Sequence, residues 1–201
     1  MTQIDSGDFD FSAYGSNISG SGGANQSDQI FPVATLDDPH IGSDNPVVTI
    51  VEFSDFECPF CGEAFPIIRK LVSAYGDSVQ LIYRDFPLAD IHPNARTAAI
   101  AGYCADTQGK FWQLHDLMFQ HQDDLSLSAI TVLARQIGID VTRFYACIAS
   151  QQATEEVDRD IADGIAAGVQ GTPTWFINGM RVAGVIPENV FRQMIEESIN
   201  Q

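Results

Sequence analysis

The chain has 201 residues, of which 45% are hydrophobic, enough to bury one sizeable core, so one elaborated domain is expected. Asp and Glu outnumber Lys and Arg by 27 to 10, and the formal charge of -17 argues against nucleic acid and anionic membranes as partners. No apolar run approaches the roughly 20 residues that span a bilayer, and the first residues do not read as a signal peptide.

The N-terminal part differs in composition from the rest. Residues 1–28 are rich in Gly, Ser, Asn and Asp, which cannot bury enough surface to offset the entropy of ordering. We predict a flexible tether there and a folded domain over residues 29–201. If the protein is extracytoplasmic, a native signal or membrane anchor must have preceded Met1.

A strand-helix-strand unit opens the folded domain. The β-branched apolar run 47–53 predicts a buried strand, and a second strand is expected over 79–84. Between them, residues 59–75 carry apolar side chains at helical spacing, with a proline suited to the first turn. The crossover by a helix predicts that the two strands are parallel.

The second half is first helical and then returns to strands. Residues from about 93 to 168 show helical patterns with breaks that divide them into four or five helices, which indicates an inserted subdomain. Asn178-Gly179 between two short apolar runs, 174–177 and 180–183, is the strongest two-residue hairpin signal. A final helix is expected from about Pro187.

Cys58-Pro59-Phe60-Cys61 lies where the first strand ends and the helix begins. Unpaired amides and the positive end of the helix dipole favour a thiolate at Cys58, so we predict an accessible nucleophile there. Cys61, one turn later, is expected to be more buried and to act as the resolving thiol. The alternative is half of a zinc site. Zinc normally needs four ligands, and no second CxxC or close His pair is present, so no metal is predicted.

Three motifs resemble the DsbA-like branch of the thioredoxin superfamily. They are residues 51–61 around the redox pair, residues 83–88 with 92–95 and 108–112, and Gly171-Thr172-Pro173-Thr174 through Gly179. Together they cover nearly everything after residue 30. The resemblance implies an α/β, thioredoxin-like fold with an inserted α-helical subdomain, and no organic cofactor.

The resemblance also implies roles for individual residues. Pro173 would follow a cis bond and pack against the Cys58 sulfur, while Thr172 would pair with an extended substrate segment. Pro59 and Phe60 would complete the substrate-binding surface. Glu52 matches the buried carboxylate that exchanges a proton with Cys61. The alternative for Glu52 is an ordinary solvated strand residue, and for Pro173 an ordinary trans turn.

Cys104 and Cys147 lie 43 positions apart in the helical part. The resemblance implies a structural disulfide, which by the chain-entropy estimate would contribute about 4 kcal/mol. Two separate buried thiols are the alternative. Four cysteines in a close and a distant pair suit an oxidising compartment, although a cytosolic redox enzyme can also carry a lone CxxC.

The predicted function is that of a disulfide donor to extracytoplasmic proteins, acting on unfolded or partly folded chains that contain cysteines. Turnover implies a quinone-linked membrane reoxidant similar to DsbB or to vitamin K epoxide reductase. A reductase or isomerase on the same fold is the first alternative, because Phe60 replaces the His of strongly oxidising relatives. Residues 1–28 are too short and polar for a dimerisation domain, so a monomer is expected. The second alternative is a redox-inert chaperone or peptide-binding module.

Overall fold

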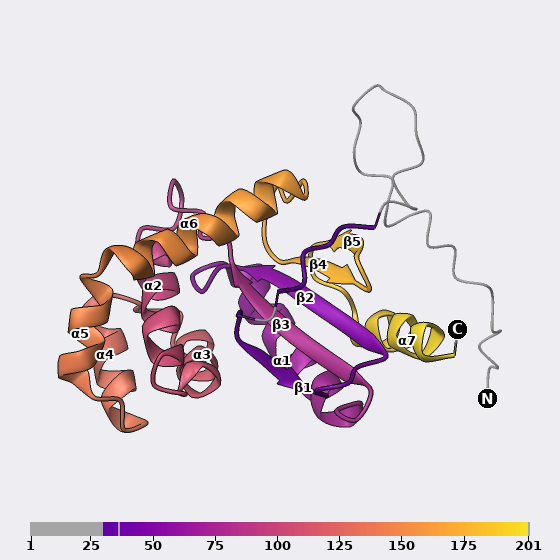
Figure 1. The fold of residues 1–201 in the computed structure, drawn as a ribbon, viewed down its shortest axis with the longest axis horizontal. Coiled ribbons are helices and arrows are strands. Elements are labelled where there is room, and N and C mark those ends of the chain that lie inside the picture. The colour runs from indigo at the N-terminus through magenta and orange to yellow at the C-terminus, as the bar shows by residue number, and fades with distance from the viewer. Residues whose placement is uncertain (1–29, 36, 201) are drawn as a thin grey trace, which may run out of the picture.

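The computed structural model describes residues 30–35 and 37–200, so the predicted tether of residues 1–28 lies outside the described residues. Five strands form one mixed sheet in the order β1-β3-β2-β4-β5 (Figure 1). The central pair, β2 (Val48–Ser54) and β3 (Val79–Asp85), is parallel, as the helical crossover between them predicted. The short β1 (His40–Gly42) pairs antiparallel with β3 at one edge of the sheet.

The other edge of the sheet is a hairpin. β4 (Thr174–Ile177) runs antiparallel to β2, and β5 (Met180–Ala183) returns beside β4. Asn178 and Gly179 both have positive φ, at 47° and 84°, the backbone that a type I′ hairpin turn requires. Asn178 also accepts the Thr49 amide on its side-chain oxygen at 2.8 Å, which fixes the hairpin to β2.

Helices cover both faces of the sheet. α1 (Pro59–Ala74) and α7 (Glu188–Ile199) pack on one face around Trp175, which is 1% exposed. On the other face, Phe53 and Phe176 pack against residues 31–33 and the end of α6 (Gln151–Ala166). The fold is thus thioredoxin-like, with the core divided by the sheet into two apolar layers.

Five helices are inserted between β3 and β4. α2 (Ala95–Asp106), α3 (Phe111–Gln120), α4 (Leu127–Gln136) and α5 (Val141–Ile148) gather in a lobe at one end of the sheet, and α6 runs back across the sheet (Figure 1). The lobe has its own core, which continues into the active-site end of α1 through Phe56 and Cys61. Within the described ranges, no helix has both the length and the apolar character that crossing a membrane requires.

Candidate active site

Cys58 lies at the N-cap of α1, with Pro59 in the first turn, so local sequence places its sulfur beside unpaired amides. Its amide donates to Asp55 O at 3.1 Å, and Gln122 donates to Cys58 O at 3.0 Å and to Phe56 O at 2.7 Å. The loop before the helix is therefore held by the helical lobe as well as by its own backbone. The sequence did not indicate a role for Gln122 at this site, because only the fold brings the turn after α3 and this loop together.

The Thr172-Pro173 peptide bond is cis, and this loop lies directly against Cys58. The Cys58 thiol donates to Thr172 O at 3.4 Å. Cys58 is only 3% exposed, so the accessibility that we expected from its position at a helix end is wrong. The reason is that the loop carrying Pro173 covers the sulfur.

The two thiols have opposite electrostatic environments. A hydrogen bond from the Cys61 thiol, together with the Thr172 side chain and the amides of Cys61 and Phe60, lowers the pKa of Cys58 from 9.0 to about 5, although burial opposes this. Burial raises the pKa of Cys61 well above 9.0, and the charges of Glu52 and Cys58 raise it further. At neutral pH the reduced pair therefore holds a thiolate at Cys58 and a thiol at Cys61.

Glu52 is 2% exposed on the face of β2 that α1 covers. Burial raises its pKa from 4.5 to about 8, with a small opposing effect from the Ser54 hydroxyl. Glu52 thus carries its proton at neutral pH and lies close enough to Cys61 to influence the pKa of that thiol. Glu52 is therefore buried, and the alternative of an ordinary solvated strand residue is wrong.

Two acidic residues in the loop before α1, Asp55 and Glu57, accept hydrogen bonds that hold this loop in place. Asp55 accepts the amides of Glu57 and Leu88, both at 2.8 Å, and lies 2.7 Å from His92 Nδ1. Glu57 accepts the Asn94 amide at 2.6 Å. These contacts join the loop before Cys58 to the start of the helical lobe. They give a structural role to residues 83–88 and 92–95 of the second sequence motif.

Phe60 is the exposed part of the motif. The Phe60 side chain is 59% exposed, and Pro59 before it is exposed as well. Ile91, which is 69% exposed, lies on the loop between β3 and α2. A large apolar side chain left in water two residues from Cys58, as Phe60 is, is typical of a surface that receives another chain.

Cys104 in α2 and Cys147 in α5 form a disulfide that ties two helices of the lobe together. Cys104 is completely buried, whereas Cys147 is partly buried. Cys58 and Cys61 are free thiols. The four cysteines therefore separate into a reactive pair on α1 and a bonded pair in the lobe.

His115 is buried inside the helical lobe. It is 1% exposed and surrounded by aromatic rings, with its Nδ1 2.8 Å from Asp116 Oδ1. Helix α3 places it inside the lobe core because its aromatic neighbours bury that whole side of the helix.

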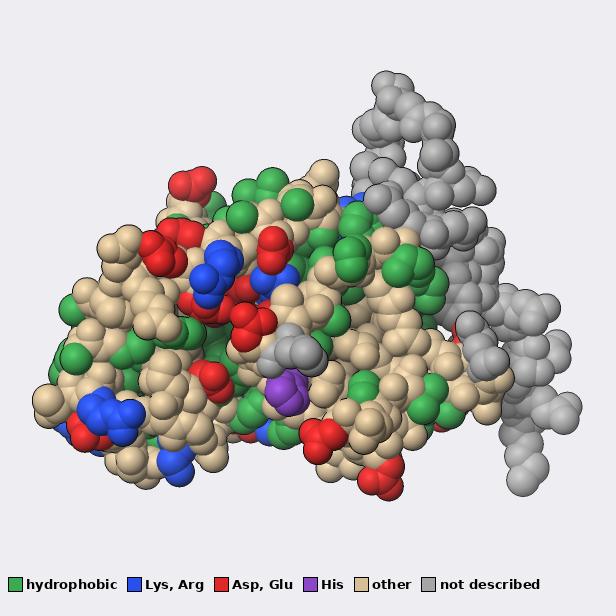
Figure 2. Space-filling model, viewed as in Figure 1, with side chains coloured by type: hydrophobic (Ala, Val, Ile, Leu, Met, Phe, Trp, Pro, Cys, Tyr) green, Lys and Arg blue, Asp and Glu red, His purple; other side chains and the backbone are tan. Residues whose placement is uncertain are grey.

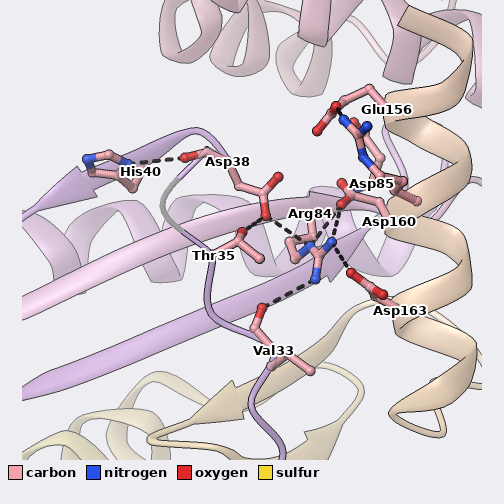
Figure 3. Close-up of polar contacts among 10 residues, drawn as sticks. Val33, Thr35, Asp38, His40, Arg84, Asp85, Glu156, Asp160 and Asp163 are labelled. Atoms are coloured by element: carbon pink, nitrogen blue, oxygen red, sulfur yellow. Dashed lines mark hydrogen bonds and ion pairs between the residues drawn. The ribbon is translucent and has the colours of Figure 1, made fainter. Parts of the chain in front are cut away.

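An acidic group beside α6 surrounds a buried arginine (Figure 3). Arg84 contacts Asp38 at 3.0 Å, Asp160 at 2.6 Å and Asp163 at 2.7 Å. Asp38, Asp160 and Glu156 offer oxygen atoms within 4.8 Å of one another, an arrangement that can hold a metal ion. Because the guanidinium already lies between two of these carboxylates, we read the group as an ion-pair network. Figure 2 shows the acidic and basic side chains that gather on this face.

The comparisons with known proteins agree with the fold. A family model described as thioredoxin matches residues 34–197, so the chain belongs to the thioredoxin family. A thioredoxin-like oxidoreductase from Silicibacter pomeroyi DSS-3 has the same fold, with a TM-score of 0.76 and 24% identity over 84% of this chain and 96% of that one. The thiol-disulfide exchange protein alpha-DsbA2 from Wolbachia pipientis gives a TM-score of 0.74 and 24% identity over 81% and 87%. The chain thus shares the fold of these two proteins.

A longer relative also contains this domain. A Na(+)/H(+) antiporter, NhaA 3 of Salinispora tropica, is 41% identical over 143 residues, which are 71% of this chain and 22% of that protein. The chain thus spans about a fifth of the length of curated relatives that it matches. The similarity concerns a domain, and the activity named for the whole relative is not carried by it.

Proposed function

We propose that this protein is a thiol-disulfide oxidoreductase that donates its Cys58–Cys61 disulfide to extracytoplasmic proteins. The observation that carries the proposal is the asymmetry of the pair: a stabilised thiolate at Cys58 and a buried, protonated Cys61. Stabilising the thiolate favours the reduced protein over its disulfide, so the oxidised protein tends to pass its disulfide to a substrate.

The reaction follows from these positions. A substrate thiolate attacks Cys58, which forms a mixed disulfide and releases Cys61, and Cys61 takes up a proton. A second substrate thiolate attacks the substrate sulfur of that mixed disulfide, forms the substrate's own disulfide and releases Cys58 as the thiolate. The substrate is oxidised by two electrons and the enzyme pair is reduced by two.

The surface around Cys58 supports a polypeptide substrate. Thr172 lies outside β4, so its backbone can pair with an extended segment, as in strand addition. Exposed Phe60 and Pro59 add apolar contact on the other side of the sulfur. We infer that the partners are unfolded or partly folded chains with cysteines, and that a quinone-linked membrane protein similar to DsbB or to vitamin K epoxide reductase regenerates the disulfide.

The location is proposed from the second disulfide. Disulfides persist mainly in oxidising compartments, and Cys104–Cys147 lies in the lobe, away from the reactive pair. We propose an extracytoplasmic site of action for this domain, as a monomer.

A reductase on the same fold is the second candidate, favoured by Phe60, which adds neither a hydrogen bond nor positive charge to the thiolate. Equilibration of the Cys58–Cys61 pair with glutathione separates the two. The donor requires a potential well above that of thioredoxin, about -270 mV, and toward that of DsbA, about -120 mV. A value near the lower figure would assign the reductase role.

The substrate step has its own test. Cys61→Ser should accumulate a mixed disulfide between Cys58 and a peptide supplied in its disulfide form, because the Cys58 thiolate attacks the peptide disulfide and the Cys61 thiol that would displace the peptide is missing. Cys58→Ser should form none, and Cys104 and Cys147 should stay bonded in both variants. Absence of any mixed disulfide with Cys61→Ser would favour a redox-inert binding module.

A further inference from the structure

Four polar side chains share the face of the sheet that lies beneath α1. The register of the parallel strands pairs Glu52 with Tyr83 and Ser54 with Asp85. Alternate residues of a strand point to the same face, so the four side chains form one patch. Cys61, on α1, packs in the same buried cluster as Tyr83, so it lies against this patch.

The patch is sealed from solvent, with exposed fractions of 2% for Glu52, 1% for Tyr83, 0% for Ser54 and 7% for Asp85. Three of its atoms, Ser54 Oγ, Tyr83 Oη and Asp85 Oδ1, are buried and form no hydrogen bond with the described residues. An unsatisfied buried polar group costs about 1–3 kcal/mol, and proteins usually satisfy such groups with ordered water. Ordered water between these side chains would satisfy the three atoms.

The chemistry proposed above needs a proton path at this place, so the inference rests on the proposed function. When Cys61 attacks a mixed disulfide, its proton has to leave the buried site. Glu52 is the adjacent acceptor, but it is already protonated at neutral pH. It can take the Cys61 proton on one oxygen only if it passes its own proton onward from the other.

Asp85 connects this patch to the acidic group beside α6. It is the last residue of β3, and its amide donates to Asp160 Oδ2 at 2.7 Å. Arg84 joins Asp160 to Asp163, whose side chain is 55% exposed (Figure 3). Burial, and then the charge of Asp160, raises the pKa of the Asp85 carboxyl well above 3.8.

We propose that Ser54, Tyr83 and Asp85, bridged by ordered water, form a proton relay between the Glu52–Cys61 pair and solvent near Asp163. In the reductive direction the relay carries the Cys61 proton out, and in the oxidative direction it returns a proton to Cys61. Other titratable or charged groups reach this face from the packed elements and take part in its pH dependence: Cys58 on α1, Asp55 after β2, His115 on α3, Asp160 on α6, and Asp38 and Arg84 beside them.

The test is the oxidation of the reduced protein by dithiodipyridine, a neutral aromatic disulfide that the acidic surface does not repel. Cys58 attacks it, forms a mixed disulfide and releases one thiopyridone. Cys61 then attacks the Cys58 sulfur, closes the protein disulfide and releases the second. The first phase reports Cys58 alone, and the second phase reports loss of the Cys61 proton.

Asp85→Asn should leave the first phase unchanged and slow the second by about 10- to 100-fold, at or below the lower end of what positioned acids and bases contribute, with an altered pH profile. Tyr83→Phe, which removes only the hydroxyl, should act in the same direction. Asp140→Asn is the control: Asp140 caps α5 in the helical lobe by accepting the Arg143 amide, and it lies on neither strand of the Glu52 face.

The outcomes are distinguishable. If Asp85→Asn does not fold, as judged by circular dichroism, Tyr83→Phe and Ser54→Ala decide. Wild-type rates and pH profiles in the folded variants would overturn the relay, and so would an equal slowing in Asp140→Asn. Release of only one thiopyridone by the wild-type protein would instead show that Cys61 does not resolve, which removes the proposed function itself.

Discussion

Replacing Glu52 by Gln should stabilise the protein at neutral pH while slowing its chemistry. The pKa of Glu52 is about 8 in the folded protein against 4.5 for the ordinary group. Because the folded value is raised, the stability contribution is fully present below pH 4.5 and is lost as the pH rises toward 8. Between pH 4.5 and pH 7, about 2.5 pH units, the free energy of unfolding therefore falls by about 3 kcal/mol.

The glutamine keeps the shape of the protonated carboxyl and cannot ionise in the unfolded chain. We therefore expect the free energy of unfolding of Glu52→Gln to exceed that of the wild type by about 3 kcal/mol at pH 7, and to match it at pH 4. For a chain of this size, that is roughly 6–12 °C in melting temperature. Urea denaturation at the two pH values measures it, with exposed Glu63→Gln as the control.

The same variant should slow disulfide exchange on the order of 10²-fold, since the proton acceptor for Cys61 is removed. Stopped-flow exchange with a peptide disulfide across pH 5–8 measures the rate. Equal stability of variant and wild type at pH 7 would refute the burial argument. An unchanged rate across this range would make Glu52 a purely structural residue.

Alkylation of the reduced protein at pH 6 should modify Cys58 first because it alone is a thiolate there, and faster labelling of Cys61 would contradict the assignment. The Cys104–Cys147 disulfide should survive reductants that open the active-site pair, because Cys104 is fully buried; peptide mass mapping checks this. Reducing only the active-site pair should raise the melting temperature by a few degrees at pH 8. The gain should shrink toward pH 5, because the lowered pKa of Cys58 makes its contribution disappear there. Phe60→His should enlarge the gain at pH 6, and a fall on reduction would indicate a reductase.

Periodicity in the sequence was enough to predict most elements of the fold. Alternating and β-branched runs predicted β2 and β3, and Asn178-Gly179 predicted the hairpin, because strand and turn preferences are local. β1 was missed. Its three residues, His40–Gly42, carry no apolar pattern and form a strand only through their pairing with β3.

The sequence by itself also determined the reactive centre, because a CxxC at the start of a helix specifies its own electrostatics through the helix amides. It could not decide whether Glu52 was buried, nor show that Ser54, Tyr83 and Asp85 share its face. Polar residues in strands usually face water, and these are buried because α1 and the helical lobe cover them from distant parts of the chain. Only the tertiary structure decides which of the 27 acidic residues meet Arg84 or lose their charge, since that depends on burial and on neighbours far away in sequence.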